Sequence, residues 1–230
     1  ANETCSGASA ACPVDGVQPA GVVCRAVSDS CDVTETCSGA SAVCPADASS
    51  PGCTGAGPGI AFIKRVGSGG DTTTSTATAI TVPAGGVAAG NTLIVSFVMD
   101  PATGTVSCGD SRGNVYSKDA DVSNGTVAAG IRTIIFSAPI TVPLVAGDTI
   151  TVAHPAVAAK AIGVNEFAGL GAFDRTASAT GTNTTPSSGF TAVTNQSDEL
   201  LIGAIGVETH ATDAFTTGAG FTALLPGFSG

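Results

Sequence analysis

The sequence predicts a mostly β protein, in which a small disulfide-rich repeat arm (1–57) precedes an antiparallel β-sandwich (58–230) of the jelly-roll or Ig-like type. Seven of the eight cysteines lie within the first 53 residues, where a 13-residue motif also recurs. The rest of the chain is a succession of short apolar runs separated by Gly, Pro, Asn and Asp. The apolar residues of the whole chain are mainly Ala, Val and Ile, and the chain has 31 Gly and no Trp, which favours strands and tight turns over helices.

Disulfides are expected to hold the arm together. It has few large apolar residues, so burial of a core cannot stabilise it. Zinc fits the spacing badly because there is no CxxC pair and no His before His154. Disulfides imply an oxidising, extracellular compartment, and the start at Ala1 without a Met or an apolar leader suggests a mature or trimmed chain. The predicted disulfide cysteines are Cys5, Cys12, Cys24, Cys31, Cys37, Cys44, Cys53 and Cys108.

The arm contains an internal repeat. The motif ETCSGASAACPVD at 3–15 recurs as ETCSGASAVCPAD at 35–47, with 11 of 13 positions identical at an offset of 32. Units of such an array contact mainly their neighbours, so we expect an elongated arm rather than a globule. A spacer is the simplest role for it, and a loop that binds a partner receptor is the alternative.

The stretch 23–47 carries a distinctive pattern of residues: Cys24-Arg25, Cys31-Asp32, Glu35, Cys37, Gly39, Ser41, Cys44-Pro45 and Asp47. In these residues it resembles the C-terminal part of the disintegrin-like module of secreted metalloproteases and snake-venom disintegrins. The resemblance implies that Cys24 pairs with Cys44 and that a loop tip, here Ser30-Cys31-Asp32 without Arg-Gly-Asp, faces an integrin. Spacing alone leaves the pairing open, since eight cysteines allow 105 connectivities. The candidate partner-binding residues are Arg25, Ser30, Asp32 and Glu35.

Nine strand-sized runs are expected after the turn-rich stretch SSPGCTGAGPG, which marks a domain boundary near residue 58. The run 92–99 is apolar throughout and is expected to be central, whereas 130–138 alternates and is expected nearer an edge. The segment GDSRGNVY at 109–116 has the residues of a hairpin turn. The predicted strands are 60–66, 76–82, 92–99, 105–108, 130–138, 148–153, 160–167, 174–180 and 199–207.

Four motifs of this region give it a family likeness: NTLIVSF, DSRGNVY, TASATGTNTTPSSG and ELLIGAIGV. In these it is similar to β-sandwich domains of bacterial secreted proteins. It contains one cysteine, Cys108, while the arm holds an odd number. Parity therefore predicts that Cys108 pairs with an arm cysteine, most plausibly Cys53, and an intermolecular bridge is the alternative.

Catalytic constellations are not evident in the sequence. The two histidines, His154 and His210, sit in no HExxH or triad context and are expected to be ordinary loop residues. Spacing leaves glycosidase carboxylate pairs open, although a chain with no Trp and one Tyr offers little for sugar stacking. We therefore predict no enzyme activity, no catalytic residue and no cofactor.

Charge and hydropathy also exclude some partners. The net charge of -10 repels nucleic acid, and no run of about 18 apolar residues predicts a membrane span. No metal site is predicted; a structural calcium is the alternative to a solvated acidic face, but no EF-hand spacing is present. The acidic residues concerned are Asp15, Asp29, Asp32, Glu35 and Asp47.

Glycans are a further expectation for a secreted chain. Sequons of the Asn-x-Ser/Thr type occur at Asn2, Asn124, Asn183 and Asn195, and Thr-rich stretches lie at 72–78 and 176–185. Chance is the alternative, because a chain rich in Thr and Asn produces sequons without selection.

These observations favour an extracellular or cell-surface structural protein. The leading hypothesis is a self-assembling subunit of a filament, fibre or layer, in which the arm contacts a neighbouring subunit. Small side chains suit close packing, and PGFSG stands where one more strand is expected, which would leave an open sheet edge for a neighbour to fill. The alternatives are an adhesin or receptor-binding module that uses the loop from Arg25 to Cys37, with a cell-surface receptor or glycan as partner, or an accessory domain of a secreted hydrolase.

Overall fold

The computed structural model describes residues 17–27, 33–45, 59–126, 129–195, 199–208 and 216–224. Within these ranges every regular element is a β-strand, so the mostly β class that the sequence predicts is confirmed. Contacts divide the chain into two compact units, Ala1–Gly59 and Ile60–Gly230. We call them the small unit and the large unit.

A short hairpin-like pair of strands forms the described part of the small unit. β1 (Val23–Arg25) and β2 (Glu35–Thr36) are antiparallel. Backbone hydrogen bonds from Cys37 N to Val22 O (2.7 Å) and from Gly21 N to Cys37 O (3.0 Å) extend the pairing beyond the strands. So short a ladder is marginal without further support, which the disulfide described below provides.

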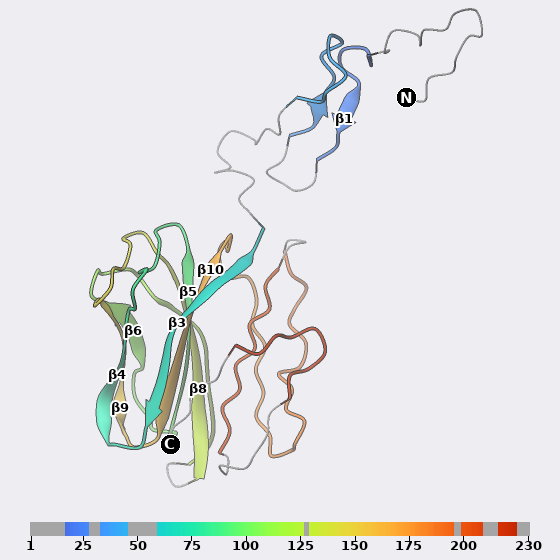
Figure 1. Ribbon diagram of the computed structural model, residues 1–230. Helices are drawn as coiled ribbons and strands as arrows, with labels where there is room; N and C mark the ends of the chain where they lie inside the picture. Colours follow the sequence, from blue (N-terminus) through green and yellow to red (C-terminus); the bar gives the residue numbers. More distant parts are fainter. Residues whose placement is uncertain are drawn as a thin grey trace, which may run out of the picture. The chain divides into compact units, whose positions relative to one another are not determined.

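Eight strands build the large unit (Figure 1). Five form one sheet in the order β3-β10-β5-β8-β7, and three form a second sheet in the order β4-β9-β6; every neighbouring pair is antiparallel. β5 is central in its sheet, as its apolar sequence predicts. The strands are β3 (Ala61–Asp71), β4 (Ser75–Thr81), β5 (Thr92–Met99), β6 (Ser107–Asp110), β7 (Ser117–Thr126), β8 (Ala129–Pro139), β9 (Thr149–Val157) and β10 (Lys160–Ala168).

One hydrophobic core lies between the two sheets. Phe97 of β5 and Phe136 of β8 enter it from the five-stranded sheet, and Ile150 and Val152 of β9 enter it from the three-stranded sheet. All four side chains are at most 2% exposed. Because side chains alternate along a strand, each strand can give one face to this core and the other to its surroundings. Each such side chain contributes about 1.5–3 kcal/mol by burial.

The chain alternates between the sheets as it proceeds. β3 belongs to the five-stranded sheet, β4 to the three-stranded one, β5 to the first again and β6 to the second. β7 and β8 then form a hairpin in the five-stranded sheet, β9 returns to the other sheet, and β10 inserts between β3 and β5. The first and last strands of the large unit are therefore hydrogen-bonded neighbours.

Two of the predicted strands are wrong. Neither 174–180 nor 199–207 pairs with another strand of the described chain. Side-chain hydrogen bonds hold the first segment instead: the Asp174 carboxylate accepts from Asn195 N (2.8 Å) and Nδ2 (2.8 Å). The segment 199–207 shows the alternating burial of a strand but is not hydrogen-bonded to a neighbouring strand. Alternation arises whenever one face of an extended segment is covered, and it does not require backbone pairing.

The predicted hairpin at 109–116 is also wrong. This turn joins β6 to β7, which belong to different sheets, so it connects the sheets rather than two paired strands. The hairpin lies instead between β7 and β8. The sequence does not predict β7, because SKDADVSNGT has only two β-branched residues, Val122 and Thr126, and no aromatic one.

Candidate functional site

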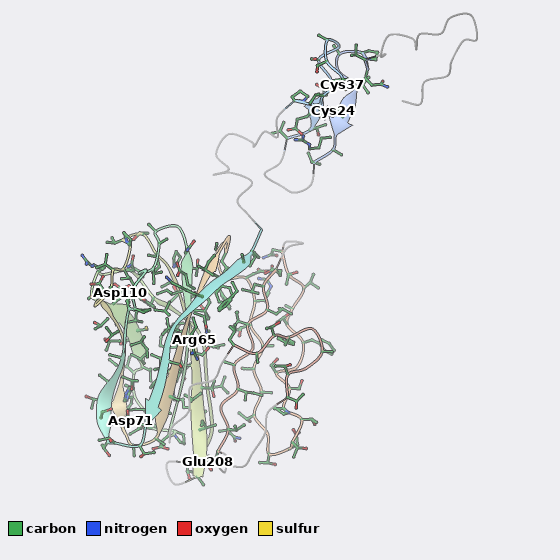
Figure 2. All side chains as sticks on the ribbon, viewed as in Figure 1. Cys24, Cys37, Arg65, Asp71, Asp110 and Glu208 are labelled. Carbon is green, nitrogen blue, oxygen red and sulfur yellow. A yellow bond between two sulfur atoms is a disulfide. The ribbon has the colours of Figure 1, made fainter. Side chains whose placement is uncertain are left out.

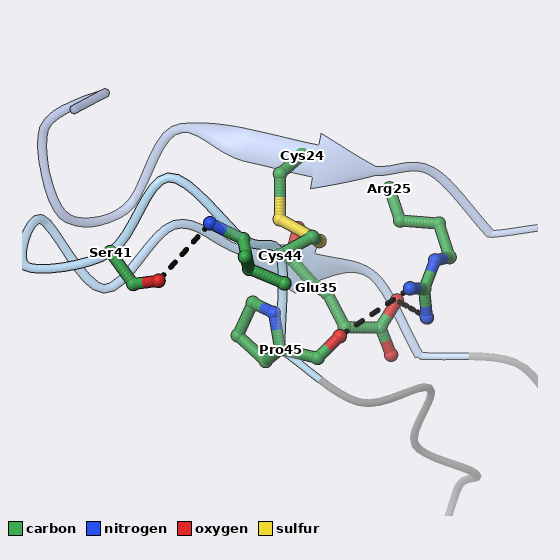
Figure 3. The surroundings of a disulfide bond; sticks show 7 residues. Cys24, Arg25, Glu35, Ser41, Cys44 and Pro45 are labelled. Atoms are coloured by element: carbon green, nitrogen blue, oxygen red, sulfur yellow. Dashed lines mark hydrogen bonds and ion pairs between the residues drawn. A yellow bond between two sulfur atoms is a disulfide. The ribbon is translucent and has the colours of Figure 1, made fainter. Parts of the chain in front are cut away.

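A disulfide between Cys24 and Cys44 closes the small unit (Figure 3). It is the pair that the disintegrin-like resemblance implies, and its Cα atoms are 5.8 Å apart. Gly39 of the repeated CSGAS motif adopts a φ of +76°, and a Cβ there would lie 2.9 Å from the backbone nitrogen of Ala20. The glycine of the motif is thus required both by its left-handed backbone and by the close approach of Ala20.

Two of the candidate partner-binding residues bind each other at the base of the loop. Arg25 Nη1 lies 3.5 Å from Glu35 Oε2, and Arg25 Nη2 donates to Pro45 O at 3.4 Å (Figure 3). Glu35 is buried, so its carboxylate is a structural partner of Arg25 rather than a group presented to a receptor. Several predicted site residues lie outside the described residues, namely Cys5, Cys12, Cys31, Cys53, Asn2, Ser30, Asp32 and His210.

Cys37 and Cys108 have no disulfide partner in the described part of the chain. Cys108 lies on β6, where its side chain is partly buried against the hydrophobic core. Burial, and secondarily the nearby Asp110 carboxylate, raises the pKa of the Cys108 thiol to about 12. Disulfide formation proceeds through the thiolate, so the free thiol reacts slowly in this environment. Cys53 lies outside the described residues, and both the clamp to Cys53 and an intermolecular bridge stay predictions.

We expect Cys108 to resist alkylation in the folded protein. With the pKa near 12 instead of the ordinary 9.0, native protein at pH 8 holds about a thousandfold less Cys108 thiolate than unfolded protein. Iodoacetamide labelling followed by peptide mass spectrometry measures the rate, and the same protein in urea serves as the reference. Equally fast labelling in both states, or a mapped bridge from Cys53 to Cys108, would contradict the expectation.

The three described sequons differ in the accessibility of the nitrogen that would carry a glycan. Asn124 Nδ2 donates to Gly181 O (3.1 Å), and Asn195 Nδ2 donates to Asp174 Oδ1 (2.8 Å). Asn183 lies in an exposed stretch, and its Oδ1 accepts from Thr185 N (3.2 Å). Glycosylation stays a prediction, with Asn183 the best placed of the three.

Buried charged side chains of the large unit have structural partners. The Lys160 side chain is fully buried, and its Nζ donates to Asp71 Oδ1 (2.7 Å), Thr73 O (2.6 Å) and Ala158 O (3.1 Å). These three acceptors use all three donors of an ammonium group. The ion pair with Lys160 also lowers the pKa of Asp71 below its ordinary value.

Glu166 is buried at the same sheet but in a different setting. Its Oε1 accepts from Asn91 Nδ2 (2.6 Å) and Ala88 N (3.1 Å), while Oε2 lies 3.4 Å from Lys64 Nζ. The carboxylate thereby ties the loop before β5 to strands β10 and β3. The three groups described here are donors or cations, so Glu166 has a structural role in joining these elements.

His154 corrects the expectation of a loop histidine. It lies on β9, is buried, and its ring stacks on Phe97 with centroids 5.2 Å apart. Nδ1 lies 2.8 Å from Pro155 O and Nε2 lies 3.0 Å from Thr78 Oγ1. Since a carbonyl can only accept, Nδ1 donates to Pro155 O, and with Thr78 at its other nitrogen the ring of His154 is a hydrogen-bonded part of the core.

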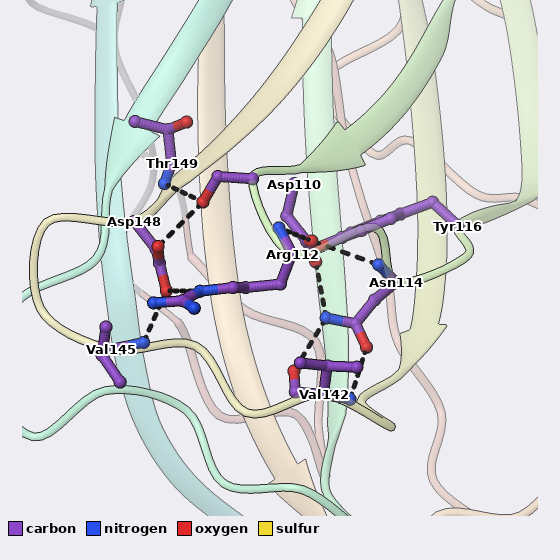
Figure 4. Close-up of polar contacts among 9 residues, drawn as sticks. Asp110, Arg112, Asn114, Tyr116, Val142, Val145, Asp148 and Thr149 are labelled. Carbon is purple, nitrogen blue, oxygen red and sulfur yellow. Dashed lines mark hydrogen bonds and ion pairs between the residues drawn. The ribbon is translucent and has the colours of Figure 1, made fainter.

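The loop between β6 and β7 is held by two aspartates (Figure 4). Asp110 accepts from Arg112 N (2.9 Å), Asn114 Nδ2 (3.0 Å) and Tyr116 OH (3.1 Å), while Asp148 accepts from Arg112 Nε (2.7 Å). Burial, with Asp110 nearby, raises the pKa of Tyr116. In Figure 2, Asp110 and Asp71 lie near opposite ends of the large unit. These polar side chains form their hydrogen bonds within the loop, so their role in this structure is to hold its conformation.

The segment 199–208 packs one of its faces on the five-stranded sheet. A Cβ on Gly206 would collide with the Thr133 side chain of β8 and approach Val98 of β5 at 3.2 Å. Glu208 Oε1 accepts from Gly130 N at 2.7 Å, beside the β7–β8 hairpin. The glycine therefore permits a close approach of this segment to the sheet.

The other face of the same segment is apolar and exposed. Leu201, Ile205 and Val207 are 61%, 42% and 51% exposed, while Ile202, Ala204 and Gly206 between them are partly covered. Apolar side chains on both faces of an extended segment are typical of a strand that is buried on both sides. Here the outer side is only partly covered, with the Phe221 ring near Gly203. We call the partly exposed apolar strip of Leu201, Ile205 and Val207 the 201–207 face.

Neither a metal centre nor a membrane span is found among the described residues. No three His, Cys, Asp or Glu side chains gather there in a way that could hold an ion. Of the acidic residues considered for calcium, only Glu35 lies in the described ranges. Within those ranges no helix is long and apolar enough to cross a membrane.

Comparison with known proteins yields no relative: no family, curated protein or solved structure matches this chain.

Proposed function

We propose that this protein is an extracellular structural protein that self-assembles, as a subunit of a surface filament, fibre or layer. The 201–207 face is the observation that carries the proposal. Its three large apolar side chains lie in one strip, and burying the exposed half of each would contribute about 1 kcal/mol. The buried charged groups described above all have structural partners, which supports a structural rather than a catalytic role.

The proposed architecture of the large unit is a β-sandwich of the jelly-roll type. Strands of alternating sheets succeed one another, and the first strand pairs with the last. In an Ig-like sandwich of the constant type, the first strand pairs with the second instead. Only β7 departs from strict alternation, because it pairs with β8 in the five-stranded sheet.

The small unit is proposed as the arm that contacts a neighbouring subunit. Its disulfide supports an oxidising, extracellular location. The ion pair between Arg25 and Glu35 supports a spacer over a receptor-binding loop, because both side chains are engaged within the arm. Cell-surface localisation and glycosylation at Asn183 belong to the same proposal.

Loss of apolar surface on the 201–207 face should weaken self-association. We expect the double variant L201N/I205N to shift the protein toward monomer and to raise the concentration of half-association about tenfold, since it removes two exposed apolar side chains. Light scattering over a concentration series measures the shift, and electron microscopy shows whether filaments or layers disappear.

The matched control is V115N. Val115 is 78% exposed but lies in the loop between β6 and β7, away from the 201–207 face in the sequence. This variant should associate as the parent does. A parent protein that stays monomeric at high concentration would refute self-assembly, and equal behaviour of V115N and L201N/I205N would refute the role of the face.

A further inference from the structure

The two sheets have four edge strands, and three of them are protected against pairing. β7 carries Lys118, Asp119 and Asp121, and β3 carries charges at both ends, including Lys64 and Asp71. β6 has only four residues. Charged side chains and short length are the ordinary means by which proteins prevent edge-to-edge association.

β4 is the unprotected edge. It has seven residues, STATAIT, with no charge and no Pro, and among the described residues it pairs only with β9. Its register with β9 is regular from Ala77 to Thr81. Ala77 and Ala79 are exposed on the outer face, whereas Thr78 and Ile80 point toward the interior. Within the described residues no strand pairs with the outer side of β4, where only the Ala77 carbonyl has a side-chain donor, the Ser75 hydroxyl (3.2 Å).

The absence of charge on this edge favours contact between two copies there. The chain has a net charge of -10, so two copies repel each other over most of their surface. No charged residue occurs between Asp71 and Asp100, a stretch that includes all of β4. The neighbouring strand β9 contains no Asp, Glu, Lys or Arg either.

We propose that β4 pairs antiparallel with β4 of a second copy across a two-fold axis. The two three-stranded sheets then form one continuous sheet in the order β6-β9-β4-β4-β9-β6. This inference rests on the proposed self-assembly and names one of its contacts. The partner is a second copy because a neutral strand with small outer side chains can lie beside itself without like-charge contacts.

Charge placed on β4 should disrupt the pair. In an antiparallel two-fold pair, Ala77 and Ala79 of one copy lie opposite or diagonal to the same residues of the other. The variants A77D/A79D and A77K/A79K each bring like charges together, so each alone should weaken dimerisation about tenfold or more. An equimolar mixture of the two should restore association, because opposite charges then face each other. Analytical ultracentrifugation measures all three samples.

The matched control is S117D/S123D, which adds the same charge to the exposed edge strand β7. It should associate as the parent does. Weaker dimerisation of each β4 variant alone, with dimerisation restored in their mixture, supports the β4 contact. Undiminished association of A77D/A79D while L201N/I205N loses it would overturn this inference and leave the proposed function standing. A parent protein that is monomeric would overturn both.

Discussion

Replacing Arg132 by Ala should lower the free energy of unfolding of the large unit by about 2 kcal/mol, because it removes four hydrogen bonds made by a buried guanidinium to partly exposed acceptors. The guanidinium binds Asp121 through two bonds, Nε to Oδ1 (2.7 Å) and Nη2 to Oδ2 (2.8 Å). Its Nη1 donates to Ala102 O (2.8 Å) and Gly104 O (2.9 Å). Urea denaturation followed by circular dichroism measures the change.

Acid should weaken the same contact in the parent protein. The hydrogen bonds from Arg132 lower the pKa of Asp121 from 3.8 to about 2. A lowered pKa in the folded state stabilises the fold above the unfolded value, and this contribution is lost as the pH falls from about 4 through 2. Because Asp121 is exposed, solvent screening limits the contribution to about 1 kcal/mol. The variant D121N should show a flatter dependence on pH over this window. Identical slopes for parent and D121N would contradict the assignment.

Exchange of Cys24 and Cys44 for Ser should unfold the small unit while the large unit stays folded. The disulfide closes a loop with a sequence separation of 20, which by chain entropy stabilises the fold by about 3 kcal/mol. The unit has only two short strands and no described hydrophobic core to replace that contribution. Hydrogen exchange at the amide of Cys37, which donates to Val22 O, reports the loss directly.

The control for this prediction is C108A, which removes a cysteine from the large unit. Hydrogen exchange in the small unit should be unchanged in C108A, since Cys108 has no described disulfide partner. Retention of slow exchange at Cys37 in the double Ser variant would show that other contacts suffice to hold the small unit.

Strands of the core could be predicted because burial imposes a pattern on them. β5 is apolar along its length and β8 alternates, and both lie where the sequence places strands. β7 could not be recognised, since it is an edge strand whose polar side chains follow from its exposure. The segment 199–207 shows the opposite error: its apolar alternation indicates a strand, but pairing depends on a neighbour that no local pattern specifies.

The candidate sites were less accessible to sequence reasoning. The pairing of Cys24 with Cys44 followed only from a resemblance, because spacing leaves the connectivity of eight cysteines open. Arg25 and Glu35 are adjacent in the β1–β2 pair, so their mutual contact depends on register and has no signature along the chain. The sequence shows that 72–99 has no charged residue, but only the order of strands in the sheet shows that β4 lies at an edge.

Pairing of the first strand with the last determines how the large unit bears a pulling force. Ala61 of β3 lies opposite Ala168 of β10, at the same end of the ladder, and the strands run antiparallel from there. Tension applied through these two residues therefore peels the strands apart one hydrogen bond at a time instead of shearing many together. Such an unzipping geometry is mechanically weak. In the proposed assembly, a load passed sideways between copies through the sheets would not pull directly on this pair of strands.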